Sequence, residues 1–515
     1  MTHDPAIDKT ESLIAAGRQL AAQFDDDHDR PVYHFVPPWG ALKDINGLIY
    51  YKGRYHVFYQ HNPRGGYWEN ITWMSWGHAS SVDLVHWVHH PIALSPQEGG
   101  PDGSMCASGV ALLDKQGAAT LIYLGLPGGM CIAQSRDDLL IHWDRHAANP
   151  VIRCPQAGEP AFDKYVVHDP CAWLDGQTYY ALLGNKIPGR DGDAATLFRS
   201  ADLVRWQYVG PFYDSDRRWT NDYEDCAVPD FFPLGDRHML VFCSHRLGSQ
   251  YYLGRLHGER FEPDVHGRMS WSGGHLGGPQ TMLDGQGRRL YFDWIRETRG
   301  GKRQRASGHC GAMTLGRVLS LDGGGHLRIE PAPEYEVLRM NRRQCGRMHL
   351  PADSEQPLAD IRGDCMELAI ELQPQGARQF GVKVRCSPYG DEQTVIIFDT
   401  EADTMTIDVG RSTLDKSIIY YCFRHYDDPT SRKLHPELEA TTTFQQAPFS
   451  LGPDETLTLR LFLDRSLLEV FANARQCMTQ RLHPTRPDSN NIILFTRGGD
   501  MTVKSVHAWD MAPAH

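Results

Sequence analysis

No long apolar run occurs in the sequence. Nowhere in its 515 residues do apolar side chains continue for the roughly 20 positions that a membrane-spanning helix requires. The first nine residues are polar and lack the basic start and apolar core of a secretory signal. We therefore expect no membrane partner and no export.

Positive charge is also in short supply. The chain has 64 Asp and Glu against 52 Lys and Arg, which gives a formal net charge of −12. A nucleic-acid surface needs a basic face to meet phosphates, so this balance argues against a nucleic-acid partner. A neutral, hydroxyl-rich substrate fits the charge better than one rich in phosphate.

Paired cysteines are a third absence. The 12 cysteines stand singly, with no CxxC pair and no histidine spacing typical of a zinc site. We interpret them as free thiols and small core residues. Together with the missing signal, they predict that the protein works in a reducing cytoplasm.

Helical periodicity is confined to the start of the chain. Residues 8–24 carry apolar side chains near helical spacing, among them Leu20 and Phe24, and a polar run at residues 25–29 ends the pattern. Short strand-like runs separated by Gly, Asp and Pro follow as far as the C-terminus. We therefore predict an all-β protein with a short N-terminal helix in an extension over residues 1–30.

A repeat organises the next part of the chain, residues 31–340. A second pattern, in which a serine and an aspartate-leucine pair precede a tryptophan, occurs three times and ends at Trp87, Trp143 and Trp206. Two patterns in step favour radial repetition over chance recurrence, and they predict a five-bladed β-propeller. The first pattern is a strand-turn-strand unit centred on a glycine, at spacings of 64, 59, 59 and 52 residues: Gly53, Gly117, Gly176, Gly235 and Gly287.

The repeat ends near residue 340. Beyond it, runs that alternate apolar and polar residues occur at short, regular spacing, as at residues 366–372, 394–398 and 456–463. This pattern is typical of two antiparallel sheets packed face to face. We predict a β-sandwich domain over residues 341–515.

Five residues stand upstream of the repeated glycines, where the first strand of each blade is expected: Asp44, Ser108, Asp169, Glu224 and Gln280. The innermost strands of a propeller converge on its central channel, so equivalent positions face one another across one pocket. Three of the five are carboxylates set among hydrophobic or turn residues. We predict that these three acids meet in that pocket.

Three carboxylates in a partly dry pocket are suited to glycosidic cleavage. Their repulsion separates their proton affinities, so one can donate a proton while another stays ionised. The donor protonates the leaving oxygen, and the other attacks the anomeric carbon or positions water. A single acid could equally cap a turn, but three in register favour a site. Nearby aromatics, including Trp68 and Trp294, can stack on sugars, although many tryptophans belong to cores.

Several segments, in order, carry a family likeness. They are WGALKDINGL at residues 39–48 with YHVFYQHNP at 55–63, Ser-Gly at 108–109, His-Asp-Pro at 168–170, EDCAVPDFF at 224–232 and LDRSLLEVFAN at 463–473. Together they resemble the motifs of glycoside hydrolase family 32, the invertases and fructan-cleaving enzymes. The likeness runs from about residue 30 to the C-terminus, and the number of motifs makes it specific.

The resemblance implies a retaining hydrolase of terminal β-D-fructofuranosides, such as sucrose or a fructan, that uses no metal or other cofactor. By position, Asp44 would be the nucleophile that forms a fructosyl-enzyme ester, and Glu224 would be the acid/base. Asp169 would stabilise the oxocarbenium-like transition state through sugar hydroxyls. The fructosyl pocket implied by the motifs is lined by Asn46, Gln60, Trp68 and Ser108.

Two residues beside the acids depart from the family pattern. Lys43 stands where the family has Asn before the nucleophile, and His168 replaces the Arg of Arg-Asp-Pro. A buried Lys beside a carboxylate favours its ionised form, whereas His lacks the forked contact of Arg. Ile45 also replaces the usual proline. We predict that Lys43 and His168 reach the substrate and alter selectivity among fructosides, with the chemistry retained.

Three other interpretations are open. A five-bladed hydrolase of the arabinose- and xylose-cleaving families would invert configuration, and the motif set argues against it. A fructosyltransferase of the same fold, including one that forms a cyclic dianhydride, would use the same covalent intermediate as a hydrolase. A fructoside-binding relative without turnover is disfavoured by the three acids but left open by Lys43 and His168. The preferred fructoside, exo or endo action and the oligomeric state are not determined by the sequence.

Overall fold

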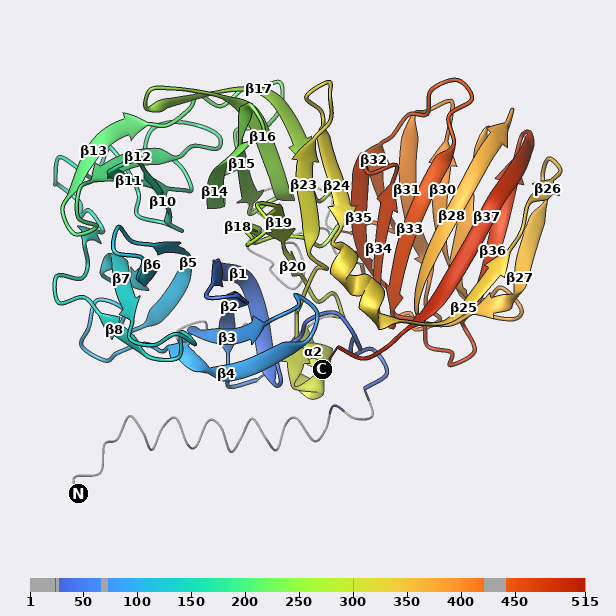
Figure 1. The fold of residues 1–515 in the computed structure, drawn as a ribbon, viewed down its shortest axis with the longest axis horizontal. Helices are drawn as coiled ribbons and strands as arrows, with labels where there is room; N and C mark the ends of the chain where they lie inside the picture. The colour runs from blue at the N-terminus through green and yellow to red at the C-terminus, as the bar shows by residue number, and fades with distance from the viewer. Residues whose placement is uncertain (1–23, 25–26, 66–72, 300, 421–440, 515) are drawn as a thin grey trace.

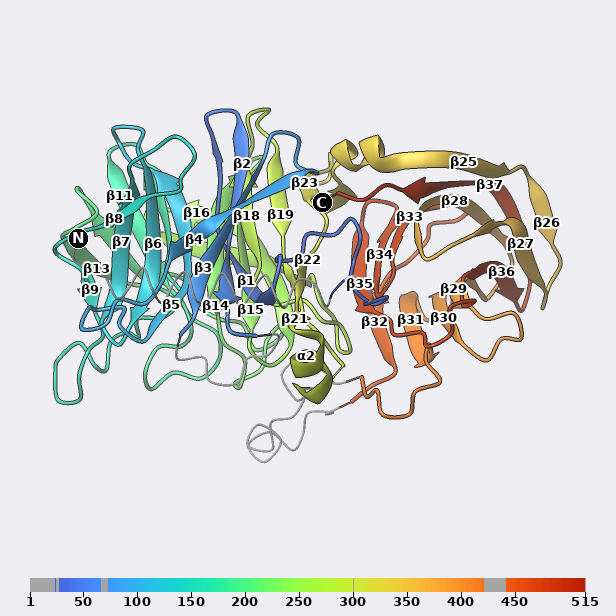
Figure 2. The same ribbon diagram turned by 90° about the horizontal axis from the view of Figure 1, so that it is seen from below.

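The structure, a computed structural model, describes residues 24, 27–65, 73–299, 301–420 and 441–514. The predicted N-terminal helix lies outside these residues except for its last position, Phe24. Figures 1 and 2 show two bodies side by side, a propeller and a sandwich. Among the described residues, no helix is long and apolar enough to cross a membrane.

Within these residues, five antiparallel sheets form the five blades that the repeat predicts, and the propeller is confirmed. In each blade the first strand lies innermost (Figure 1). The strands of blades 1 to 5, in turn, are β1 (Gly40–Tyr51), β2 (Arg54–Asn62), β3 (Ser75–Ser81) and β4 (Trp87–Leu94); β5 (Met105–Leu113), β6 (Ala119–Leu126), β7 (Gly129–Ser135) and β8 (Trp143–Arg145), with β9 (Ile152–Arg153) beside β7; β10 (Cys171–Asp175), β11 (Thr178–Leu183), β12 (Thr196–Ser200) and β13 (Trp206–Pro211); β14 (Ala227–Leu234), β15 (Arg237–Ser244), β16 (Gly248–His257) and β17 (Arg260–Arg268); β18 (Gln280–Leu283), β19 (Arg289–Phe292), β23 (Arg317–Leu321) and β24 (Leu327–Pro331).

The ring is closed by a short strand from the far end of the propeller. Strand β21 (His309–Cys310) pairs in parallel with the start of β1. Between blade 5's second and third strands the chain also forms β20 (Trp294–Ile295), helix α2 (Gly301–Ser307) and β22 (Ala312–Met313), with β20 paired to β22. The chain therefore returns to its first blade before it enters the sandwich.

The sequence repeat has a simple physical origin. The five repeated glycines lie in the turns between the first and second strands of the blades. All five have φ between +57° and +80°, a left-handed conformation that glycine adopts without the steric cost of a Cβ. The second pattern marks the turn between the third and fourth strands. In blade 1, for example, Asp83 there accepts the backbone N–H groups of Val85 and His86 at 3.0 and 2.8 Å.

Two sheets packed face to face form the sandwich, as predicted. Their cores come from alternating residues, such as Leu368, Ile370 and Leu372, which are all buried. A 3-10 helix, η1 (Pro333–Leu338), leads into the first sheet, and the predicted domain boundary at residues 340/341 falls within the first strand after it. In spatial order the strands are β25 (Arg339–Cys345), β37 (Asp500–Met511), β28 (Cys365–Gln375), β33 (Leu457–Asp464), β34 (Leu467–Ala472) and β35 (Gln476–Arg481), with β26 (Met348–Leu350) beside β37, in one sheet, and β27 (Glu355–Arg362), β36 (Asn491–Arg497), β29 (Gln379–Cys386), β30 (Gln393–Asp399), β31 (Thr404–Arg411) and β32 (Phe444–Pro448) in the other.

A chain of buried charges joins the propeller to the sandwich. Arg317, at the start of β23, donates to the carboxylate of Glu469 on β34 at 2.6 Å, and both residues are fully buried. The other Glu469 oxygen lies 3.2 Å from Nε2 of His34, whose Nδ1 lies 2.9 Å from Asp464. Burial alone would raise the pKa of Glu469, but the charges and hydrogen bonds of Arg317 and His34 lower it to about 2. The joint therefore keeps this carboxylate ionised at neutral pH.

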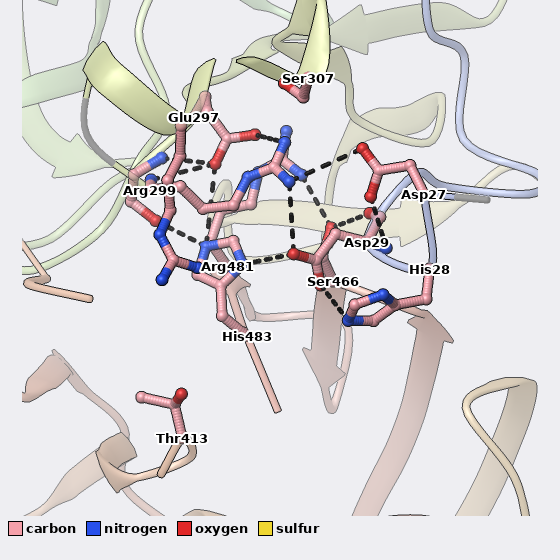
Figure 3. A network of polar contacts seen from close by, with 12 residues as sticks. Asp27, His28, Asp29, Glu297, Arg299, Ser307, Thr413, Ser466, Arg481 and His483 are labelled. Carbon is pink, nitrogen blue, oxygen red and sulfur yellow. Dashed lines mark hydrogen bonds and ion pairs between the residues drawn. The ribbon is translucent and has the colours of Figure 1, made fainter. Parts of the chain in front are cut away.

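A second polar cluster extends the joint (Figure 3). The Arg299 guanidinium lies 3.1 Å from Glu297 and 3.3 Å from Asp29. From the sandwich side, His483 Nδ1 lies 3.6 Å from Asp29, and Ser466 Oγ donates to the Asp29 carbonyl at 2.6 Å. The segment that precedes β1 is thereby held between the two domains.

We predict that Arg317→Met destabilises the protein by about 3–5 kcal/mol, because it leaves Glu469 buried without its main counter-charge. The matched control is Arg328→Met on the neighbouring strand β24, whose partner Glu330 is half exposed at 3.2 Å. Its expected cost is below about 1 kcal/mol. Urea unfolding measures both, and equal losses in the two variants would contradict a structural role for the buried pair.

Candidate active site

The five positions singled out by the repeat lie toward the N-terminal ends of the innermost strands. Asp44, Ser108 and Gln280 belong to β1, β5 and β18, while Asp169 and Glu224 lie just before β10 and β14. All five are buried, with at most 6% of their surface exposed. These strands surround the centre of the propeller in Figure 1. The ring of blades therefore gathers three carboxylates from blades 1, 3 and 4.

Asp44 is held by neighbours from three blades. Its Oδ2 accepts a hydrogen bond from Ser108 Oγ of blade 2 at 2.7 Å, and Ser108 in turn accepts one from Gln60 Nε2 at 2.5 Å. From the entry to blade 5, Gly278 approaches so closely that a Cβ there would lie 2.8 Å from the Asp44 Cα. Lys43 Nζ lies 3.7 Å from Asp44 Oδ2. The carboxylate thus has a fixed orientation and a cation beside it.

Asp169 occupies an unusual stretch of backbone. Its φ is +38°, and its Oδ2 accepts the N–H of Val228, whose φ is +45°, at 3.2 Å. Left-handed conformations in residues other than glycine cost of order 1–3 kcal/mol and cluster at functional sites. Val228 lies four residues after Glu224 in the chain. This hydrogen bond therefore connects Asp169 to the segment that carries Glu224.

The charge on Asp169 is set by its neighbours. Nδ1 of His168 lies 2.9 Å from Asp169 Oδ2. Burial alone would raise the pKa of Asp169, but the charge and hydrogen bond of His168, followed by the charges of His245 and Lys43, hold it well below its usual range. Asp169 is therefore ionised at any pH at which the protein works, so it is not suited to donate a proton.

Glu224 is fully buried within blade 4. Its Oε2 accepts from Gln250 Nε2 at 3.0 Å, and its Oε1 accepts from the backbone N–H of Asn221, also at 3.0 Å. Arg268 lies against both oxygens, with Nη2 3.2 Å from Oε1. Gln250 is itself fixed, since its Oε1 contacts His266 Nε2 at 2.8 Å. The fourth blade therefore supplies the surroundings of this acid.

The other predicted site residues differ in their surroundings. The side-chain amide of Asn46 is fully buried beside the backbone N–H groups of Gln60 and Gly109. Trp294 is 5% exposed and packs in the propeller core with Leu42 and other apolar residues. Trp68 lies outside the described residues. Gln280, the fifth ring position, donates to the Gly109 carbonyl at 3.2 Å.

Several polar groups at the site were not predicted from the sequence. Asp225 directly follows Glu224 in the sequence, but only the fold reveals that it pairs with His245. Gln250 and Arg268 come from the third and fourth strands of blade 4, β16 and β17, which carry no shared motif. Their place beside Glu224 depends on how those strands fold back, and no pattern in the sequence encodes that.

This arrangement can support acid/base and covalent chemistry. Each of the three acids is held by at least one donor before any substrate binds, which is the preorganisation that catalysis requires. The acids lie in different surroundings: a hydroxyl and a Lys beside Asp44, two His beside Asp169, and an amide and an Arg beside Glu224. In the described part of the chain, no group of three or more His, Cys, Asp or Glu is arranged to hold a metal ion.

Comparison with known proteins gives consistent matches. The family model described as "Glycosyl hydrolases family 32 N-terminal domain" matches residues 34–331, and that described as "Glycosyl hydrolases family 32 C terminal" matches residues 334–510. The sucrose-6-phosphate hydrolase of Escherichia coli is 28% identical over 98% of this chain and 100% of that protein. The raffinose invertase of Escherichia coli is 28% identical over 93% of this chain and 94% of that protein.

Solved structures share the fold. The fructan 1-exohydrolase IIa of Cichorium intybus superposes with a TM-score of 0.81 at 23% identity, covering 94% of this chain and 98% of that one. A Glu-to-Gln variant of that enzyme has been solved in complex with 1-kestose. The sucrose-6-phosphate hydrolase of Lactobacillus gasseri gives a TM-score of 0.78 at 21% identity, covering 98% and 97%.

We predict that Lys43→Met raises the pKa of His168. Burial lowers the pKa of His168, but Asp169 and Asp225 raise it above its ordinary value of 6.5, and Lys43 opposes them. Because the pKa of His168 is higher in the folded than in the unfolded protein, its charged form adds to the free energy of unfolding. This contribution is complete below the pKa of the unfolded state and is lost as the pH rises through the pKa of the folded state.

Imidazole NMR titration, with His168→Gln to assign the signal, measures this pKa directly. Lys52→Met is the control, because Lys52 is exposed and pairs with Asp138. An unchanged or lower His168 pKa in Lys43→Met would contradict the electrostatic description of the site.

Proposed function

Because the chain belongs to glycosyl hydrolases family 32, we propose that it hydrolyses terminal β-D-fructofuranosides with retention of configuration. The observation that carries this proposal is that Asp44, Asp169 and Glu224, all three buried, stand in or just before the innermost strands of blades 1, 3 and 4. The names of the relatives, sucrose-6-phosphate hydrolase, raffinose invertase and fructan 1-exohydrolase, agree on a fructoside as substrate.

Asp44 is the proposed nucleophile. Ser108, itself held by Gln60, donates to one carboxylate oxygen, and Lys43 Nζ lies 3.7 Å from the same oxygen. The carboxylate attacks the anomeric carbon. Attack forms a fructosyl-enzyme ester as the bond to the leaving oxygen breaks. Water then cleaves the ester, which restores the carboxylate and the original configuration.

Glu224 is the proposed acid/base. It gives its proton to the leaving oxygen in the first step and takes one from the attacking water in the second. Asp169, kept ionised by its cationic neighbours, is suited to bind sugar hydroxyls and to stabilise the positive charge of the oxocarbenium-like transition state. Asn46, Trp68 and Trp294 are proposed to contribute to the fructosyl pocket with Gln60 and Ser108.

We place this activity in the cytoplasm as part of the same proposal. Eleven cysteines lie in the described residues, and all eleven carry free thiols. Free thiols are maintained in reducing compartments, whereas export favours disulfides.

We predict that Asp44→Asn lowers turnover by roughly 10⁴-fold or more, because an amide cannot form the ester. Glu224→Gln should slow sucrose by about 10²–10⁴-fold, the usual contribution of a general acid. It should largely spare the first step of an aryl β-fructofuranoside, whose leaving group departs without a proton. Asp138→Asn, at an exposed position remote from the acids, is the control.

Steady-state and burst kinetics measure both effects. Substantial turnover in Asp44→Asn would overturn the nucleophile assignment. Equal slowing of both substrates by Glu224→Gln in the burst phase would overturn the acid assignment. Products retained as fructosyl oligosaccharides or a cyclic dianhydride would identify a transferase instead of a hydrolase.

A second prediction concerns selectivity. Lys43 and His168 flank two of the acids and are each about 30% exposed, so they are placed to meet substrate hydroxyls. A hydrogen bond to one hydroxyl can change discrimination by orders of magnitude. Lys43→Asn with His168→Arg should therefore shift the ratio of kcat/KM between sucrose and other fructosides by roughly tenfold or more. A panel of sucrose, sucrose 6-phosphate, raffinose, inulin and levan measures it, and an unchanged ratio with full activity would mean that these positions carry no selectivity.

A further inference from the structure

A second histidine stands at the site and has no role in the mechanism above. His245 directly follows β15, and Asp225 lies two residues before β14, the strand paired with β15. Ala227 of β14 pairs with Cys243 of β15, which brings the two flanking residues to the same end of blade 4. That is the end at which Glu224 lies.

Asp225 fixes the His245 ring in place. One Asp225 oxygen accepts the His245 backbone N–H at 2.8 Å, and the other lies 2.5 Å from the ring Nδ1. The carboxylate is 6% exposed, so it is largely removed from water. Burial alone would raise the pKa of Asp225, but the charge and hydrogen bonds of His245 lower it, followed by the charge of His168. Since an ionised carboxylate only accepts, Nδ1 carries a proton and the ring has one orientation.

The fixed ring packs against His168. The two imidazoles meet edge to face, with centroids 5.8 Å apart and planes at 81°. This packing is a second restraint on the His168 ring, whose Nδ1 lies 2.9 Å from Asp169 Oδ2 on its other side. A run of four groups results, from Asp225 through His245 and His168 to Asp169, and it links blade 4 to the segment that begins blade 3.

The run is coupled in charge as well as in position. The charges of both His168 and His245 act on Asp169, and both also act on Asp225. Lys43, from blade 1, also acts on both His168 and Asp169. Both imidazoles keep a part-exposed edge, 29% for His168 and 28% for His245.

We propose that His245, held by Asp225, is a positioning residue that sets the His168 ring against Asp169 and so orders the side of the pocket that binds the fructosyl hydroxyls. This inference rests on the proposed function for its effect on catalysis. Its geometric part, the control of His168 by His245, does not depend on which sugar is cleaved.

The test is a double-mutant cycle of His245→Ala and His168→Ala. If His245 acts through His168, His245→Ala should lower kcat/KM by roughly 10- to 100-fold, the cost of a misplaced group at a reacting centre. In the His168→Ala background the same change should cost little. The control is His238→Ala, because His238 belongs to the same strand, β15, at its opposite end.

The choice of substrates separates His245 from the neighbouring acid. Sucrose and an aryl β-fructofuranoside share the fructosyl unit, so disordering its binding side should slow the first chemical step of both by the same factor. A loss confined to sucrose would instead mean that removing His245 disturbs Glu224 through Asp225, and it would overturn the proposal. Additive losses in the cycle would also overturn it.

A third measurement is independent of activity. In His245→Ala, the imidazole NMR signals of His168 should shift and broaden, whereas in His238→Ala they should stay in place. Unchanged His168 signals would refute the positioning role even if activity fell. If the wild-type protein cleaved no fructoside at all, the proposed function would fail, and this measurement would still decide whether His245 positions His168.

Discussion

Closure of the propeller depends on a short parallel pairing between β21 and the start of β1. That pairing brings chain segments some 270 residues apart into register, Gly40 with His309 and Ala41 with Cys310. Asp44 lies only a few residues further along β1, so the position of the proposed nucleophile is set by the last contact that completes the ring. Side-chain and backbone contacts between neighbouring blades, such as that of Gln280 with the Gly109 carbonyl, complete the fixing of the channel.

Buried charge is used at both the site and the joint, with different consequences. Taking an ion out of water costs several kcal/mol unless partners replace the lost hydration. At the joint, Arg317, Glu469, His34 and Asp464 pair with one another, and none of these four side chains is exposed. At the site, Lys43, His168 and His245 keep about 30% of their surface open. The first set can only hold the domains together, whereas the second can still exchange water for a sugar.

The sequence was most informative where a physical requirement repeats. A glycine with positive φ lies in the turn between the first and second strands of every blade. The five glycines therefore predicted the number of blades and the first strand as the place of the candidate acids. The alternation of apolar and polar residues predicted the sandwich, because one face of each of its strands is buried. The motif around Glu469 resembled a sandwich-domain signature. Only the fold shows that Glu469 binds Arg317 and His34, because both partners lie more than 150 residues away in the sequence.

Other features of the site could not be predicted from the sequence. Gln250 and Arg268 become neighbours of Glu224 through the return of β16 and β17, and their own segments give no hint of it. Trp294 was singled out as an aromatic near the motif segments, and the fold shows it 5% exposed among core residues, which the sequence alone does not reveal. The positive φ of Asp169 and Val228 likewise has no signature in residue type.

Gly278 carries a lesson for how mutational scans of this protein would be interpreted. It does no chemistry, yet its φ of +112° and its approach to Asp44 leave no room for a side chain. A residue in the fifth blade thereby constrains the first, with blade 2 on the other side of the same carboxylate. In a scan of tolerated substitutions, Gly278 would be as intolerant as the acids themselves. Its intolerance would reflect the lack of space beside Asp44, not a catalytic role.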